Sequence, residues 1–389
     1  MMQPRVSSSD NVKELAQARG SASQPRASPR LFLKIILPVL ALAGGFSVFA
    51  MYFTRLQIGF PVAGTAFQPC VEDTGALEQW IRPPSDLMHS MSDEELLWRA
   101  SWVPGVKRYP FKRVPKVAFM FLTRGPLPLS PLWERYFRGN EGRYSVYLHT
   151  HPSYKANFTL NSVFYRRQIP SKVSEWGQMS MCDAERRLLA NALLDLSNER
   201  FILLSESCIP LSNFNITYQY LMKSKYSFIG VIDDPGPYGR GRYNPDMAPE
   251  VNLEQWRKGS QWFEVNRKLA VTIVKDTAYY QKFERFCRPH CYVDEHYFPT
   301  MLTIESPHLL ANRSITWVDW SRGGAHPATF GRSDISEAFL KSIRDGQNCS
   351  YNDNHSPLCF LFARKFAPSS VEPLLELAPA LLGFGLSGK

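Results

Sequence analysis

The chain has 389 residues, of which 44% are hydrophobic and 13% aromatic, and its formal net charge is +10 at pH 7. This length allows one large or two ordinary domains with a substantial core. The basic residues are scattered and match no nucleic-acid motif, so the charge favours an anionic ligand or surface over DNA or RNA. The seven cysteines contain no Cys-x-x-Cys pair and match no zinc spacing, which argues against a structural zinc site.

The N-terminal region predicts a membrane anchor. Residues 1–30 are rich in Ser, Arg, Gln and Ala without an apolar period, which is typical of a disordered tail. Residues 31–53 form a strongly apolar run whose central part, as a helix, would rise about 28 Å, close to the hydrocarbon thickness of a bilayer. Basic residues gather before this run, so the tail is expected in the cytoplasm and the rest of the chain in the lumen. A cleaved signal peptide is the alternative, disfavoured by the long leading segment.

A lumenal position permits N-glycosylation and disulfide bonds. Four sequons are candidate glycosylation sites: Asn157, Asn215, Asn312 and Asn348. A fifth, at Asn354, is disfavoured by the proline that follows it. Cys349 and Cys359 are spaced to close a loop, and Cys287 and Cys291 lie near an acidic stretch, but the sequence does not define the pairing.

The region after the anchor divides into three parts. Residues 54–113 are irregular and are interpreted as a stem and an N-terminal extension, with a short helix from Asp93 to Ala100 opened by Ser92. A globular domain is predicted for residues 114–368. Residues 369–389 form a weakly apolar C-terminal tail to which the sequence assigns no structure.

Strands and helices alternate within the globular domain. Buried-strand patterns cover residues 115–123, 144–150, 198–204 and 227–232. Helical patterns between them include residues 131–138 and 183–195. This alternation predicts an α/β fold with a mostly parallel sheet flanked by helices, and ligands of such sheets bind at the carboxyl ends of the strands.

Polar residues follow several of these strands. Thr123 ends the first strand and is a candidate donor-site residue. His149 and His151 follow the second strand, where they are candidates for contacts with a ribose or base or, equally, solvated loop histidines. Asp233 and Asp234 can ligate a divalent cation that bridges a diphosphate. The Pro-Gly-Pro that follows them favours a turn instead.

Two later stretches combine aromatic and charged residues. Trp262 provides a flat surface on which a sugar ring can stack, and Glu264 can accept from sugar hydroxyls; a core aromatic with a surface acid is the alternative. Arg364 and Lys365 end an apolar run and can neutralise a leaving diphosphate without a metal. A surface cation pair after a strand is the alternative there.

One acidic stretch is the strongest candidate for catalysis. Asp294 and Glu295 lie between a cysteine pair and an apolar helical start, and aromatic residues on the C-terminal side of Glu295 shield it from water. A carboxylate so placed is a candidate general base. The alternative is an ordinary helix start, with Asp294 as the N-cap and Glu295 opposing the helix dipole.

The order of these motifs resembles glycosyltransferase family 14, the core-2/I-branching enzymes, and most closely its plant members. The matching segments, which together span about residues 116 to 366, are Val117–Thr123, Trp176–Gly177, Phe201–Leu211, Gly259–Phe263, Val293–His296 and Phe362–Phe366. The resemblance implies a GT-A-like domain that binds a UDP-sugar and transfers the sugar, with inversion to a β linkage, to a glycan or glycoprotein. It further implies a type II protein of the Golgi membrane.

The resemblance also assigns site residues. Glu295 matches the catalytic base of the family, and Lys365 matches the basic residue that steadies the departing diphosphate, so no metal cofactor is expected. The family's second cation has no unique counterpart here, and Arg322, Arg332 and His326 remain open. Glu264 lies near the family's acceptor-binding region, with Trp262 close by.

Departures from the animal enzymes leave the donor sugar open. Those enzymes carry an aspartate after the second strand, facing the nucleoside, where this chain has His151, and their cysteine pattern is absent. Family members move GlcNAc, xylose or glucuronic acid, and GlcNAc is the default expectation. The competing hypothesis is a non-catalytic lumenal glycan-binding or scaffolding protein, against which the retention of Glu295 and Lys365 argues. A hydrolase using Asp294 and Glu295 is disfavoured, since adjacent residues do not readily reach opposite faces of a sugar.

Overall fold

The computed structural model describes residues 86–105, 108–288 and 291–385, together with Leu42, residues 44–47, Phe49, Met51 and Tyr52. The chain divides into two units, residues 1–74 and 75–389, and the fold below is that of the second. Within the described part of the chain, no helix is both long and apolar enough to cross a membrane. The predicted tail and most of the predicted anchor and stem lie outside the described residues.

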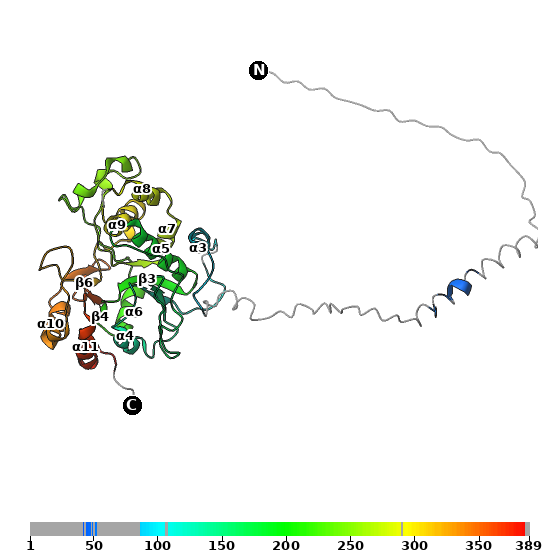
Figure 1. The fold of residues 1–389 in the computed structure, drawn as a ribbon, viewed down its shortest axis with the longest axis horizontal. Coiled ribbons are helices and arrows are strands. Elements are labelled where there is room, and N and C mark those ends of the chain that lie inside the picture. The colour runs from blue at the N-terminus through cyan, green and yellow to red at the C-terminus, as the bar shows by residue number, and fades with distance from the viewer. Residues whose placement is uncertain are drawn as a thin grey trace, which may run out of the picture. The chain divides into compact units, whose positions relative to one another are not determined.

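A four-stranded sheet with the order β2-β1-β3-β5 forms the centre of the second unit (Figure 1). Strands β1 (Lys116–Leu122), β2 (Tyr144–His149) and β3 (Asn198–Ser205) are parallel, and the short β5 (Glu264–Asn266) runs antiparallel to β3. The predicted mostly parallel sheet is confirmed, and β1, β2 and β3 end within one residue of their predicted limits.

Helices cover both faces of this sheet, which explains why its strands are nearly continuous apolar runs. Ala118 and Met120 of β1 join one apolar cluster with α5 (Met179–Leu193), α7 (Arg267–Lys275) and α9 (Val293–Glu305). Phe119 and Phe121 point to the other face and join α4 (Ser130–Phe137) and α6 (Phe214–Lys223). The alternation follows from the two-residue repeat of a strand.

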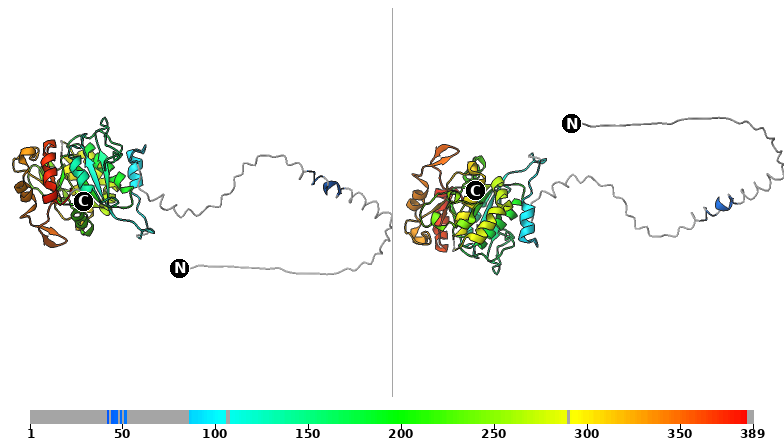
Figure 2. Two further views of the ribbon diagram at one scale, coloured as in Figure 1. Left: turned by 90° about the horizontal axis from the view of Figure 1, so that it is seen from below. Right: turned by 90° about the horizontal axis from the view of Figure 1, so that it is seen from above.

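Shorter elements surround these layers. A second sheet has the order β4-β9-β6, and β7 and β8 form a hairpin. The bounds are β4 Ile209–Pro210, β6 Thr316–Val318, β7 Cys349–Tyr351, β8 Asn354–Ser356, β9 Phe362–Arg364, α3 Asp93–Ala100, α8 Ala278–Phe286, α10 Glu337–Arg344 and α11 Val371–Leu377. Helix α3 lies at one end of this unit, with α10 and α11 at the opposite end (Figure 2).

The structure corrects two expectations from the sequence and assigns one segment that the sequence left open. The expected strand at 227–232 is irregular, because its residues form isolated bridges to three different segments, at Leu310, Glu264 and Lys258. Helix α5 begins at Met179, four residues before the predicted start. The expected C-terminal tail is folded in its described part, since Leu374 of α11 is fully buried in the cluster beneath α4.

The two cysteine pairs are bonded as their spacing permits. Cys287 is joined to Cys291, and Cys349 to Cys359, which closes the base of the β7–β8 hairpin. The other cysteines within the described ranges, Cys182 and Cys208, are buried and unbonded. All four candidate glycosylation sites have exposed side chains, and their modification stays a prediction.

Candidate active site

A cavity of about 1530 Å³ opens at the carboxyl ends of the parallel strands. Its wall includes the residues that end these strands, among them Thr123 after β1, His149 at the end of β2 and Ser205 at the end of β3. Parallel strands place their carboxyl ends at one edge of the sheet, which is where ligands bind in such folds. The volume exceeds the roughly 300 to 1,000 Å³ of a typical small-molecule site. It therefore has room for two substrates.

The acidic stretch forms one side of this cavity. The Cys287–Cys291 disulfide precedes α9, and Tyr292 is its N-cap, in a left-handed conformation with φ of 55°. The alternative interpretation, which made Asp294 the N-cap, is therefore wrong by two residues. Asp294 and Glu295 both lie in the first turn, where the helix dipole favours acidic side chains. Glu295 lines the cavity with its side chain 24% exposed.

Arg242 is a partner of Glu295 that the sequence did not identify. Its Nη1 lies 3.3 Å from Oε2 of Glu295, and its guanidinium lies 4.2 Å from the centre of the Tyr292 ring. The Tyr292 ring in turn packs 4.9 Å from Trp176. The ion pair with Arg242 fixes the direction of the Glu295 carboxylate. The sequence shows only an arginine in a glycine-rich loop, 53 residues from Glu295.

Asp294 differs from its neighbour in being buried, with only 3% of its surface exposed. Burial, reinforced by the negative charge of Glu295, raises the pKa of Asp294 to about 7. Its Oδ1 is buried without a hydrogen-bond partner in the described part of the chain. Asp294 is therefore protonated in mildly acidic solution.

Two cations form the opposite side of the cavity. Arg364 ends β9 and Lys365 follows it, and both line the cavity. Burial lowers the pKa of both groups, and for Lys365 the positive charge of Arg364 adds to this effect. The Arg364 guanidinium lies 4.0 Å from the centre of the Trp262 ring, which supports it from one side. Desolvated cations side by side form a strong anion site.

The other donor-site residues predicted from the sequence divide into two groups. Thr123 and His151 both line the cavity. Of the three alternatives for the second cation, His326 lines the cavity. Arg322 instead lies over the Phe330 ring, and Arg332 forms an exposed ion pair with Glu372. Neither arginine is among the residues that line the cavity.

The acceptor-binding role predicted for Glu264 does not fit its position. Glu264 is fully buried in β5, where Oε1 lies 3.3 Å from Arg200 Nη1 and Oε2 accepts from the Phe228 backbone N–H. It joins strands within the core and lies outside the cavity lining. Trp262 does line the cavity, but it is 94% buried and one ring face is covered by Arg364. It therefore supports the cation pair more directly than it offers a stacking surface.

The adjacent aspartates after residue 232 adopt the turn arrangement. Asp233 accepts two hydrogen bonds from Arg240, at 2.7 and 2.8 Å. Asp234 accepts from the Gly236 backbone N–H at 2.8 Å, which forms an Asx turn. Across the described ranges, no group of three or more His, Cys, Asp or Glu residues is arranged to hold a metal ion.

A close backbone contact positions the start of α9. The Gly259 N–H donates to the Glu295 carbonyl at 2.8 Å, and a Cβ at Gly259 would lie 2.3 Å from Gly230 O and 2.6 Å from Pro299 Cγ. Gly259→Ala is therefore expected to lower the free energy of unfolding by about 1 to 3 kcal/mol. Urea denaturation measures this change. Gly105→Ala, where a Cβ meets nothing within 4 Å, is the matched control, and equal stability of the two variants would contradict the proposed contact.

Comparison with known proteins identifies the family of the chain. Residues 117–344 match the family model of the Core-2/I-Branching enzyme, which is more than half of the chain. The chain is also similar to glycosyltransferase BC10 of Oryza sativa subsp. japonica, with 38% identity over 309 residues that cover 68% of this chain and 76% of that protein. The chain therefore belongs to the Core-2/I-branching enzyme family and is a glycosyltransferase.

Proposed function

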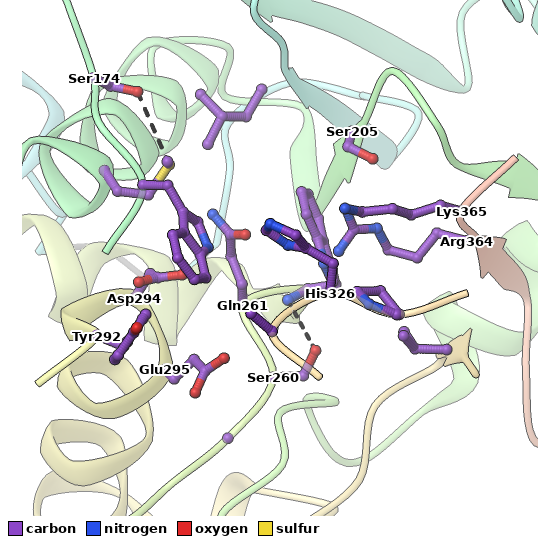
Figure 3. Close-up of a pocket in the computed structure, with 18 of the residues that line it drawn as sticks. Ser174, Ser205, Ser260, Gln261, Tyr292, Asp294, Glu295, His326, Arg364 and Lys365 are labelled. Carbon is purple, nitrogen blue, oxygen red and sulfur yellow. Dashed lines mark hydrogen bonds between the residues drawn. The ribbon is translucent and has the colours of Figure 1, made fainter. Parts of the chain in front are cut away.

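We propose that this glycosyltransferase moves a sugar from a UDP-sugar to a hydroxyl of a glycan or glycoprotein, with inversion to a β linkage and without a metal. N-acetylglucosamine is the default donor sugar. One observation carries the proposal. Glu295 lies on one side of the cavity, and Arg364 and Lys365 lie on the other (Figure 3). An in-line displacement needs its base and its leaving-group site on opposite sides of the reacting carbon, and this placement provides both.

In the proposed reaction the two sides of the cavity act at the same time. Glu295 takes the proton from the acceptor hydroxyl, whose oxygen forms a bond to the anomeric carbon on the face opposite the diphosphate. The bond between that carbon and the diphosphate oxygen breaks, and UDP leaves with its new negative charge beside Arg364 and Lys365. Attack opposite the leaving group converts an α-linked donor into a β-linked product.

The rest of the cavity is assigned to the nucleoside and to orientation of the base. Thr123 and His151, at the carboxyl ends of β1 and β2, are proposed to contact the nucleoside, as nucleotides bind at this edge in related sheets. Arg242 holds the Glu295 carboxylate through the 3.3 Å ion pair. This contact keeps the base pointed at the acceptor.

We place the enzyme in the Golgi membrane as a type II protein, with residues 31–53 as the anchor and the catalytic domain in the lumen. The apolar run and the basic residues before it support this orientation. The two disulfides and the exposed sequons are compatible with an oxidising compartment.

Transfer activity is expected to survive removal of divalent metals, because the cation pair neutralises the leaving diphosphate. The measurement is the rate of UDP release from a UDP-sugar by the full chain, with and without excess EDTA. Equal rates are expected. Loss of activity in EDTA that added Mn²⁺ restores would contradict the metal-free mechanism and return attention to Asp233 and Asp234.

The stereochemistry of the product tests the reaction itself. The full chain is incubated with a panel of UDP-sugars and simple glycoside acceptors, and proton NMR of the early product reports the new linkage. A β linkage from an α-linked donor is expected. An α-linked product would overturn the single-displacement mechanism, and no turnover with any donor would favour the non-catalytic glycan-binding alternative.

A further inference from the structure

Gln261 lies between the two sides of the cavity. Figure 3 shows its side chain between Asp294 and Glu295 on one side and His326, Arg364 and Lys365 on the other. The backbone accounts for this position. The Gly259 N–H donates a hydrogen bond to the Glu295 carbonyl, and the Trp262 ring packs against the Arg364 guanidinium. The segment between these two residues, which includes Gln261, therefore runs from the base to the cations.

The amide of Gln261 is fixed by a buried acid. Its Nε2 donates to Oε1 of Glu185 at 2.8 Å, and Glu185 lies fully buried in α5. With its N–H group turned toward α5, the amide leaves its oxygen toward the cavity as a hydrogen-bond acceptor.

Glu185 acts in this contact as a neutral group. Burial, followed by the negative charges of Asp294 and Asp183, raises the pKa of Glu185 well above its ordinary value. Within the described ranges, Oε1 of Glu185 accepts from Gln261 and Oε2 has no hydrogen-bond partner. A protonated carboxyl and a carboxamide have nearly the same shape and the same carbonyl acceptor. Glutamine is therefore the conservative replacement for Glu185.

We propose that Gln261 contacts the sugar being transferred and selects among donor sugars, and that Glu185 is the positioning residue that fixes its amide. The inference rests on the proposed function, since in an in-line displacement the anomeric carbon lies between the base and the leaving diphosphate. The transferred sugar then lies beside Gln261. The amide oxygen accepts from a ring hydroxyl or an acetamido N–H of that sugar, and a donor that lacks this group in this position leaves the oxygen unpaired.

Three variants of the full chain test the inference. Gln261→Met keeps the length of the side chain and removes the acceptor. Glu185→Met removes the oxygen that accepts from Gln261, and Glu185→Gln keeps an oxygen acceptor at that position. Gln281→Met, at an exposed position on α8, is the matched control for the glutamine change. The measurements are kcat/KM for each UDP-sugar of a panel and the Kd of UDP, which lacks the sugar.

Gln261→Met is expected to reduce the ratio of kcat/KM between the best donor and the next by about tenfold, with the Kd of UDP unchanged. Glu185→Met is expected to reproduce this loss, and Glu185→Gln to retain the selectivity of the unmodified chain. A parallel loss of UDP affinity would indicate a purely structural effect and overturn the inference.

The two proposals fail in different ways. Normal turnover with unchanged donor selectivity in Gln261→Met would overturn the role of Gln261 alone. A loss of selectivity in Glu185→Gln equal to that in Glu185→Met would overturn the positioning role of Glu185. Absence of UDP-sugar turnover by the unmodified chain would overturn the proposed function together with this inference.

Discussion

Glu295→Gln is expected to reduce the rate of sugar transfer by roughly 10² to 10⁴-fold, the usual contribution of a general base. The amide has the shape of the carboxylate but does not accept a proton at neutral pH. UDP binding is expected to stay unchanged, because Arg364 and Lys365, the proposed diphosphate site, lie on the other side of the cavity. Single-turnover rates and calorimetric titration with UDP measure the two effects separately.

The neighbouring acid provides the control for this substitution. Asp294 lies next to Glu295 on the same helix, and its pKa is raised to about 7 by burial and by the charge of Glu295. In mildly acidic buffer Asp294 is already protonated, so Asp294→Asn is expected to change the rate far less than Glu295→Gln. Near-normal transfer by Glu295→Gln, or an equal loss in both variants, would remove Glu295 from the mechanism.

Lys365→Ala is expected to weaken UDP binding by about 10 to 100-fold, the usual effect of losing a charge-assisted hydrogen bond to an anion. The loss also lowers the rate, because the departing diphosphate is less well neutralised. Calorimetric titration with UDP in EDTA measures the affinity directly.

Arg322→Ala is the matched control for this second substitution. Arg322 carries the same charge, but it packs over Phe330 and lies outside the cavity lining. Its removal is expected to leave UDP affinity unchanged. If Lys365→Ala also binds UDP with unchanged affinity, or if both variants weaken binding equally, a specific diphosphate contact at Lys365 is excluded.

Local sequence patterns were sufficient for much of the fold. The strands β1, β2 and β3 were predicted closely because each is a buried apolar run with a clear turn after it. Helix α3 begins where Ser92 predicts, since Ser92 and Glu95 form a reciprocal capping box. These signals depend on neighbouring residues and need no knowledge of the tertiary structure.

Elements defined by distant contacts were missed or misassigned. β5 has three residues and exists because Glu264 to Asn266 pair with β3, a contact that leaves Glu264 in the core. Residues 227–232 look like a strand but meet three different segments instead of one continuous partner. The C-terminal segment shows only weak apolar character in sequence and becomes a helix on packing beneath α4.

The active site was predictable only in part for the same reason. Glu295 and Lys365 are suited to their proposed roles by residue type and by their resemblance to the family motifs. The roles proposed for Arg242 and Gln261 depend on contacts across 53 and 76 residues of sequence. No local sequence pattern distinguishes Arg242 and Gln261 from the other polar residues of the chain. Glu185 is likewise an ordinary helical residue in sequence and a fully buried acid in the structure.

Binding of UDP-sugars to the full chain in the presence of EDTA tests the central claim most directly. Calorimetric titration with a panel that includes UDP-GlcNAc, UDP-xylose and UDP-glucuronic acid gives the affinity for each donor. We predict selective binding of one UDP-sugar without metal, weakened in Lys365→Ala and preserved in Glu295→Gln. Failure of the folded protein to bind any of them, or binding that requires a divalent cation, would contradict a metal-independent donor site between Glu295 and the Arg364–Lys365 pair.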